Sequence, residues 1–404
     1  MRVLYIDGVG PFGGASRSLF EAVRALKDRG VKPYFVATQG TALDFYGQVA
    51  EELIATRGLT RFDNTNYSHY RGMRWLVLLR EFFHLPFTIL AIHQAHRKWK
   101  GKIDLIHVNE VTEIIPGLLA KRLFKVPMVV HVRSPQWVNQ QAWRSRWING
   151  LLKRSASAVI AIDNTTRATL STELTVDVVQ NSFTPRRSAT PDPAMLLKLE
   201  KLRTGSLKVG FVGNVQVSKG ILDLVEAAKL LNEQGADVEF VVVGGHTRAT
   251  KGLKGWLLQK AGLAQDVVEE LERRIKHYGL EKYFHLLGAT SDIQCVYECL
   301  DVIAFPSHFD APGRPVFEAA FSAVPSIVCV SKPLADTLVH NQTGLAIPAR
   351  DPRALSEAIR HFEKCRDEVA RMGRQAQQLA IENFEPRRNA TRLHDIYKRI
   401  YQPT

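Results

Sequence analysis

Cysteine is scarce in this chain, with four residues in 404 and no C-x-x-C pair. That spacing excludes a disulfide framework and a zinc site of the usual kind. We also expect no secretory leader, because Met1 to Asp7 reads as a strand and not as a charged segment followed by an apolar stretch. We therefore expect a cytoplasmic protein whose reduced core cysteines are Cys295, Cys299, Cys329 and Cys365.

Acidic side chains are outnumbered, since 40 Asp and Glu face 54 Lys and Arg and leave a net charge of +14. Such a chain attracts anionic partners, and composition alone leaves nucleic acid, anionic lipid and phosphorylated substrates open. A hydrophobic content of 45% is ordinary for a globular protein. The length of 404 residues exceeds what one hydrophobic core usually covers, so two domains are expected.

Apolar strand-like runs alternate with helix-like segments, which is the rhythm of an α/β protein with parallel sheets. A stretch rich in Pro, Ser and Thr, residues 182–193, interrupts the rhythm, which then restarts. We predict two Rossmann-like domains, residues 1–185 and 205–383, and a helix over 384–404 that packs back on the first domain after Pro386. The predicted strands are Arg2–Asp7, Pro33–Ala37, Leu105–Asn109, Met128–Val132, Ala158–Asp163, Asp177–Asn181, Leu207–Val212, Val238–Val243, Tyr283–Leu287, Val302–Phe305, Ser326–Val330 and Gly344–Ile347.

The most informative segment is Phe305 to Val328, which places two carboxylates around a glycine turn at a helix start. Asp310 and Glu318 stand eight positions apart, and Gly313 permits a tight turn between them. The following helix, predicted over Val316 to Val324, would direct its free N–H groups at an anion such as phosphate. Glu318 would accept hydrogen bonds from a diol such as ribose. The competing interpretation is an ordinary strand, turn and helix.

Glycines follow the first predicted strand, and Gly8 to Gly14 formally satisfies G-x-G-x-x-G. An NAD(P)-dependent oxidoreductase is therefore an alternative function. The dinucleotide fingerprint also needs an acid at the end of the second strand, where Thr38 to Gly40 carries none. Farther along, His131 closes a predicted strand before Arg133, and Asn109 closes the strand before that. These side chains line one sheet edge, either as ordinary hydrogen-bonded rim residues or as part of a site.

The Phe305 to Val328 segment resembles the E-x7-E motif of the retaining glycosyltransferases of family 4. The resemblance implies that Glu318 holds the nucleotide ribose and that Asp310, in place of the usual Glu, contacts the donor sugar. It implies a donor-sugar contact for His131 in the HVRSP segment, and an acceptor-side or phosphate contact for Arg133. Gly13 and Gly14 would form the glycine loop near the donor phosphates.

The second domain opens with a segment, Val209 to Gly220, that resembles the family pattern G-R-x-x-x-E-K-G. Lys219 would meet the donor diphosphate, beside the loop residues Gly213 and Asn214. An Arg is usual where Asn214 stands, so one phosphate cation is missing. Arg314, next to Gly313, and Arg248 are the candidates to replace it.

Residues 71–102 are rich in Arg, Lys and His and hold one acid, Glu81, within an apolar run that is too interrupted to span a bilayer. One interpretation is a buried helix pair with solvated ends. The other is an interfacial patch that docks on an anionic membrane, which would suit a lipid-linked acceptor.

The resemblance as a whole implies the GT-B fold, two Rossmann-like domains facing across a cleft. It implies a metal-independent, cofactor-free, retaining transfer from a nucleotide-sugar to a saccharide acceptor that is carried on a lipid, with no nucleic-acid partner. The expected process is polysaccharide or lipopolysaccharide synthesis at the inner face of the membrane. Beside the oxidoreductase, the departures at Asn214 and Asp310 leave a further alternative: a non-catalytic, membrane-associated partner subunit with the same fold.

Overall fold

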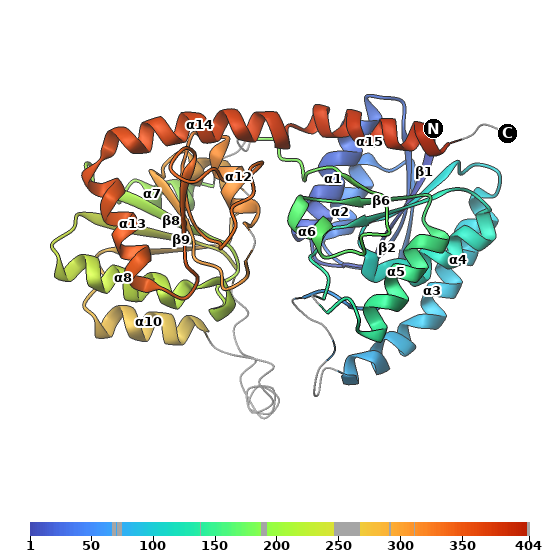
Figure 1. Cartoon of the computed structure of the whole chain (residues 1–404), viewed down its shortest axis with the longest axis horizontal. Helices are drawn as coiled ribbons and strands as arrows, with labels where there is room; N and C mark the ends of the chain where they lie inside the picture. The colour runs from blue at the N-terminus through green and yellow to red at the C-terminus, as the bar shows by residue number, and fades with distance from the viewer. Residues whose placement is uncertain are drawn as a thin grey trace. The chain divides into compact units, whose positions relative to one another are not determined.

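The computed structural model describes residues 1–66, 70, 75–137, 139–186, 192–245, 267–290, 292–310 and 312–401. The chain divides into two compact units, Met1–Thr184 with Phe384–Thr404, and Pro185–Asn383 (Figure 1). Each unit is a parallel sheet with helices on both faces, so the predicted α/β class with two Rossmann-like domains is confirmed. Arg248 and residues 71–74 lie outside the described residues.

The first unit contains a seven-stranded parallel sheet in the order β3-β2-β1-β4-β5-β6-β7. Its strands are β1 (Arg2–Asp7), β2 (Lys32–Thr38), β3 (Glu52–Thr56), β4 (Leu105–Val108), β5 (Met128–Val132), β6 (Ala158–Ala161) and β7 (Val176–Val178). Its helices are α1 (Gly14–Lys27), α2 (Ala42–Val49), α3 (Val77–Trp99), the 3₁₀ turn η2 (Val111–Glu113), α4 (Ile114–Phe124), α5 (Trp143–Ser155), α6 (Asn164–Ala168) and α15 (Pro386–Ile400). One core lies under α3, α4 and α5, and the other lies under α1, α2 and α15.

The second unit contains a six-stranded parallel sheet in the order β10-β9-β8-β11-β12-β13. Its strands are β8 (Leu207–Val212), β9 (Val238–Val243), β10 (Phe284–Gly288), β11 (Val302–Phe305), β12 (Ser326–Cys329) and β13 (Gly344–Ile347). Its helices are α7 (Pro193–Leu199), the 3₁₀ turn η3 (Val217–Lys219), α8 (Ile221–Glu233), α10 (Val267–His277), α11 (Ile293–Tyr297), α12 (Arg314–Ala320), α13 (Pro352–Lys364) and α14 (Arg366–Phe384). Helices α8, α10 and α13 cover one face, while α7, α11 and α12 cover the other.

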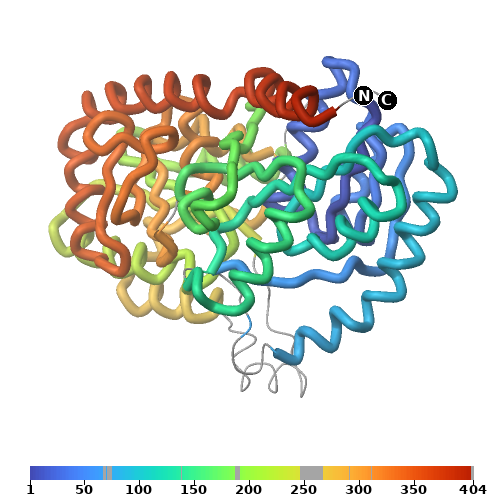
Figure 2. The backbone as a smooth tube through the Cα atoms, turned by 45° about the vertical axis from the view of Figure 1, so that its right-hand side comes forward, coloured from blue at the N-terminus to red at the C-terminus, as the bar shows by residue number. Residues whose placement is uncertain are grey.

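The last helix belongs to the first unit although it ends the chain. Glu385 caps α15 by accepting hydrogen bonds from the backbone N–H groups of Arg387 and Arg388, and Pro386 occupies the first turn. Buried side chains such as Leu393 then pack α15 beside α1. In Figure 2 the red carboxyl end of the chain accordingly lies beside its blue amino-terminal segment.

Two expectations about surface and core are wrong. Cys299 and Cys365 are exposed rather than buried, because they follow the ends of α11 and α13, where the chain turns into solvent. Residues 77–99 form the single helix α3, with Pro86 inside it, instead of a buried helix pair. Within the described part of the chain, no helix has the length and apolarity to cross a bilayer.

Candidate active site

In the second unit, the loop after β8 carries Lys219 at the end of η3. The next residue, Gly220, has φ 74°, and a Cβ there would lie 1.8 Å from the carbonyl oxygen of Pro306. Only glycine permits this close approach of two loops. The Lys219 ammonium lies 5.5 Å from the ring centre of Phe305 and 5.8 Å from that of Phe309. Burial lowers the pKa of Lys219, so a bound anion would relieve an existing desolvation penalty.

The loop after β11 meets the Lys219 loop directly, since the backbone N–H of His308 donates to the carbonyl of Ser218 at 3.0 Å. Gly313 precedes α12 and lies against the ring of Phe305, where a Cβ would come within 2.3 Å of the ring. The predicted helix over residues 316–324 is misplaced, because α12 spans Arg314–Ala320 and Ala323 turns into the left-handed region with φ 57°. The structure therefore gathers Lys219 and Gly313 around one aromatic ring.

Glu318 is buried, with 3% of its surface exposed, and both carboxylate oxygens are engaged within the unit. Oε2 accepts a hydrogen bond from the Tyr297 hydroxyl at 3.0 Å, and Oε1 pairs with Nε of Arg314 at 2.8 Å. Arg314 also lies over the ring of Phe317. The predicted replacement phosphate cation is thus held by the predicted ribose ligand, so a ligand would meet the two as one ion pair.

Asp310 and Asn214 lie on the exposed rim of the same loops. Asp310 accepts hydrogen bonds from the backbone N–H of Ser331, at 2.6 Å, and from its hydroxyl. The backbone after Asn214 bonds to Gly245 at the end of β9. The backbone of Gly213 lies directly against Gly244, because a Cβ on Gly244 would be 1.8 Å from the carbonyl oxygen of Gly213. The contacts of these residues with a donor remain predictions.

In the first unit, a buried polar network joins the carboxyl ends of the strands. Asp7 accepts hydrogen bonds from Tyr46 at 2.5 Å, Ser16 at 3.1 Å and Asn109 at 3.1 Å. Asn109 in turn accepts from Nε of Arg133 at 2.6 Å. The predicted rim residues Asn109 and Arg133 are therefore both buried and bonded to each other, which suits positioning better than direct contact with an acceptor.

The network continues to the last strand, because Arg133 Nη1 donates to the side chain of Asn181 at 2.8 Å. Asp7, Tyr46 and Asn181 were not among the predicted site residues. Asp7 and Asn181 each end a predicted strand, and this position is the signal by which they can be found.

Buried acids lie next to this network. Burial, together with the neighbouring Asp7 carboxylate, raises the pKa of Glu113 well above its ordinary value, and burial raises that of Asp7. Burial also raises the pKa of Glu110 to about 7, although hydrogen bonds from the backbone N–H groups of Val111 and Arg133 act to lower it. Burial at this edge of the sheet thus shifts the pKa of each of these carboxyl groups upward, toward the protonated form.

His131 lies in the buried part of β5, with 3% of its surface exposed, and not on the open rim. Among the described residues, neither ring nitrogen makes a hydrogen bond of good geometry. Its neighbour His107, 5.5 Å away between ring centres, is 2.5 Å from the Tyr397 hydroxyl. Burial holds the pKa of His131 well below its usual value, so the imidazole is neutral.

Gly13 and Gly14 are exposed at the start of α1, where Gly13 caps the helix. Their amides are placed to meet a polar ligand at a helix N-terminus. The second strand ends at Thr38 and is followed by Gln39, so the acid that a dinucleotide site requires is absent from that position.

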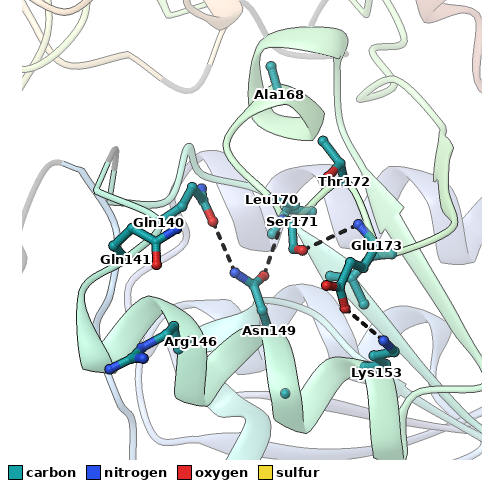
Figure 3. A pocket seen from close by; sticks show the side chains of 12 residues that line it. Gln140, Gln141, Arg146, Asn149, Lys153, Ala168, Leu170, Ser171, Thr172 and Glu173 are labelled. Carbon is teal, nitrogen blue, oxygen red and sulfur yellow. Dashed lines mark hydrogen bonds and ion pairs between the residues drawn. The ribbon is translucent and has the colours of Figure 1, made fainter.

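A separate pocket of about 530 Å³ lies between α5 and the segment joining α6 to β7 (Figure 3). Asn149 at its centre donates to Gln140 at 3.0 Å, and Lys153 pairs with Glu173 at 2.7 Å. None of the predicted site residues lines this pocket. The strand-end residues of the first unit are therefore distinct from it.

Two family models together match most of the chain. The model described as Glycosyl transferases group 1 matches residues 198–379, and the model described as Glycosyltransferase Family 4 matches residues 12–183. Each match falls entirely within one of the two structural units.

Curated proteins with similar sequences are sugar transferases. A glycogen synthase of Mycobacterium tuberculosis is 21% identical over 310 residues, covering 74% of this chain and 69% of that protein. An Escherichia coli enzyme named UDP-Gal:alpha-D-GlcNAc-diphosphoundecaprenol alpha-1,3-galactosyltransferase is 25% identical, covering 57% of this chain and 58% of its own length. Anabaena Alr3699/HepE, solved in complex with UDP and glucose, superposes with a TM-score of 0.75 at 20% identity, over 99% of this chain and 100% of that one. The last likeness shows a shared fold over the whole chain.

Proposed function

Because the chain belongs to the group 1 and family 4 glycosyltransferases, we propose that it transfers a sugar from a nucleotide-diphosphate sugar to a saccharide acceptor. The activity class is a glycosyltransferase, and the oxidoreductase alternative has no support among the related proteins. The donor class draws support from Alr3699/HepE, which was solved with UDP and glucose.

The observation that carries this proposal is the setting of Lys219. A cation partly removed from water, beside two aromatic rings and at the carboxyl end of a parallel sheet, suits a diphosphate whose negative charge grows as the sugar leaves. Glu318, fixed by Tyr297 and Arg314, is oriented in advance to accept hydrogen bonds from a ribose. In this unit, Lys219 would stabilise the leaving group and Glu318 would position the nucleotide.

We further propose that transfer retains the anomeric configuration and requires neither a metal nor a cofactor. Family membership favours retention, and Lys219 supplies positive charge to the departing phosphate where other enzymes use a divalent ion. His131, as a neutral imidazole, would hydrogen-bond a sugar hydroxyl without competing for the phosphate. The anomeric signal of the product in proton NMR, with and without EDTA, tests both statements.

The acceptor is proposed to be a saccharide carried on a lipid. The related E. coli galactosyltransferase is named for a diphosphoundecaprenol substrate, and a related Staphylococcus aureus protein is named as a capsular polysaccharide biosynthesis glycosyltransferase. A place in surface polysaccharide synthesis, at the membrane, follows from the same proposal. Lipopolysaccharide is one polymer of this class.

The deciding experiment compares Lys219→Ala with Lys229→Ala. Lys229 in α8 also lies over an aromatic ring, that of Tyr278 at 5.1 Å, so it is a matched lysine away from the loops. We first identify the donor by thermal shift across UDP-, GDP-, ADP- and CMP-sugars, because a ligand at 100 times its Kd adds about 2.7 kcal/mol of stability. Transfer should then fall on the order of 10²-fold in Lys219→Ala and stay unchanged in Lys229→Ala. Equal activity of both variants would refute the proposal, and donor turnover by the purified wild-type chain excludes a non-catalytic subunit.

A further inference from the structure

Helix α3 presents an apolar face to solvent. Phe82 and Phe83 are 69% and 68% exposed, and Leu76, Leu79 and Leu90 are exposed nearly as far. The opposite face, with Ile92 and Trp99, is buried against the sheet of the first unit. A surface helix normally turns polar side chains outward, so this outward apolar stripe needs a partner.

Aromatic side chains extend the stripe onto α5. Trp143 and Trp147 are 57% and 36% exposed, and both contact Phe62, at 6.3 and 4.8 Å between ring centres. Phe62 contacts Tyr70, which stacks on Trp75 just before α3. We call the combined face the α3/α5 surface, formed by Trp75, Leu76, Leu79, Phe82, Phe83, Leu90, Trp143 and Trp147.

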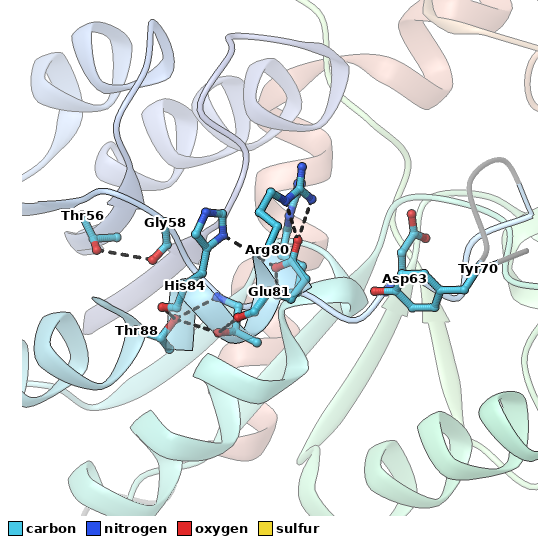
Figure 4. Close-up of polar contacts among 10 residues, drawn as sticks. Thr56, Gly58, Asp63, Tyr70, Arg80, Glu81, His84 and Thr88 are labelled. Carbon is cyan, nitrogen blue, oxygen red and sulfur yellow. Dashed lines mark hydrogen bonds and ion pairs between the residues drawn. The ribbon is translucent and has the colours of Figure 1, made fainter. Parts of the chain in front are cut away.

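The charged side chains that α3 and α5 expose are basic. Glu81, the only acid of the two helices, is turned inward and buried, where it accepts from the backbone N–H of Arg61 at 2.7 Å and pairs with Arg80 at 2.5 Å (Figure 4). The exposed basic side chains are Arg80, Arg97, Lys98, Arg146, Lys153 and Arg154. Lys98 pairs with Glu52 at 2.6 Å and Lys153 with Glu173 at 2.7 Å, so positive charge predominates without being the only sign present.

From these observations we propose that the α3/α5 surface docks on an anionic lipid bilayer. Exposed Phe and Leu side chains insert among the acyl chains, Trp residues favour the headgroup level, and the basic side chains meet anionic headgroups. A protein partner would normally also be bound through hydrogen bonds at the interface. The α3/α5 surface instead presents apolar side chains and positive charge, which favours a lipid bilayer. The net charge of +14 acts in the same direction.

The surface lies at the edge of the first unit that carries its polar network. Phe62 donates its backbone N–H to the carbonyl of Thr112 at 2.7 Å, next to the buried Glu113. Docking through α3 and α5 would therefore bring the strand ends of this unit close to a saccharide attached to a membrane lipid. This consequence rests on the proposed function, whereas the docking itself does not.

The test is sedimentation with vesicles that contain no saccharide, made from one part phosphatidylglycerol and two parts phosphatidylcholine. The double variant Phe82→Ser/Phe83→Ser should bind on the order of 100-fold more weakly than wild type, since each Phe that inserts into the bilayer contributes on the order of 10-fold. The control is Leu197→Ser, at an apolar residue of α7 that is 60% exposed, and it should bind as wild type does. Binding should also weaken in high salt and on vesicles of phosphatidylcholine alone.

Equal binding to neutral and anionic vesicles, or equal binding of the double variant and wild type, overturns the proposal. The proposal is also overturned if wild type does not bind vesicles and instead forms a dimer in analytical ultracentrifugation that the double variant does not form. Transfer to a soluble saccharide acceptor should survive in the double variant. If wild type binds vesicles but transfers no sugar to the soluble acceptor, the result counts against the proposed function and leaves the docking proposal standing.

Discussion

Replacing Glu318 separates its structural contacts with Arg314 and Tyr297 from its proposed role as a ribose ligand. In the structure this carboxylate holds Arg314 through one oxygen and Tyr297 through the other, in a setting where Glu318 is almost fully buried. Glu318→Ala removes both acceptors at once. Glu318→Gln keeps the shape: its amide oxygen can accept from Nε of Arg314 and its NH2 group can donate to the Tyr297 hydroxyl, so it removes mainly the negative charge.

The magnitudes follow from this geometry. Breaking one side of a buried ion pair costs about 3–5 kcal/mol, so Glu318→Ala should lower the free energy of unfolding by about 3 kcal/mol or more. Glu318→Gln keeps a hydrogen bond from the charged Arg314 but removes its opposite charge, and should cost less, about 1 kcal/mol. Glu233→Ala breaks an exposed pair with Lys229, at 3.7 Å in α8 of the same unit, and should stay within about 0.5 kcal/mol.

The free energy of unfolding of the second unit is measured by urea titration, with hydrogen exchange in peptides covering β11 to β12 as the readout. Transfer assays on the same proteins should show a loss on the order of 10²-fold for Glu318→Ala and a smaller loss for Glu318→Gln. If Glu318→Ala were no less stable than Glu233→Ala, the carboxylate would not anchor Arg314. If its activity stayed at the wild-type level, the ribose contact would be ruled out.

Two further predictions concern a loop glycine and a buried acid. Gly220→Ala puts a Cβ 1.8 Å from a backbone oxygen at positive φ and should cost about 2–5 kcal/mol, whereas Gly235→Ala, at φ 66° with no atom within 4 Å, should cost about 1–2 kcal/mol in urea unfolding; equal costs would contradict the close loop contact. For Glu110, burial raises the folded pKa from 4.5 to about 7, so the native state binds more protons than the unfolded state between these values and loses stability as pH rises. Wild type should therefore lose about 3 kcal/mol relative to Glu110→Gln from pH 4.5 to 7 in urea titrations, and parallel pH profiles would refute the shift.

Most of the fold follows from the sequence because parallel strands buried on both faces are continuous apolar runs. Every predicted strand is present, some with ends moved by a few residues. The missed strand, β3 (Glu52–Thr56), is a five-residue edge strand that is only partly buried, and its mixed composition gives neither an apolar run nor a clear alternation. The misplaced end of α12 depends on Ala323 adopting a left-handed turn, a conformation that its sequence does not specify.

The candidate site was less accessible to sequence reasoning. Lys219, Gly313 and Glu318 are recognisable because each belongs to a short motif within one loop and helix start. The network of the first unit is different, since Asp7 and Asn109 are 102 positions apart and meet only because β1 and β4 are neighbours. The surroundings of His131 are likewise assembled from distant segments, because the adjacent His107 bonds to Tyr397 of α15 at the far end of the chain.

The return of α15 to the first unit fixes the order in which this protein can be completed during synthesis. A ribosome that has released residues 1–184 has made all seven strands of the first sheet, yet Leu393 and Tyr397 of its core are still to be translated. The second unit, Pro185–Asn383, is whole before they emerge. Nascent chains halted before α15 should therefore expose an unfinished amino-terminal core to chaperones and proteases, while the later-made unit is already folded.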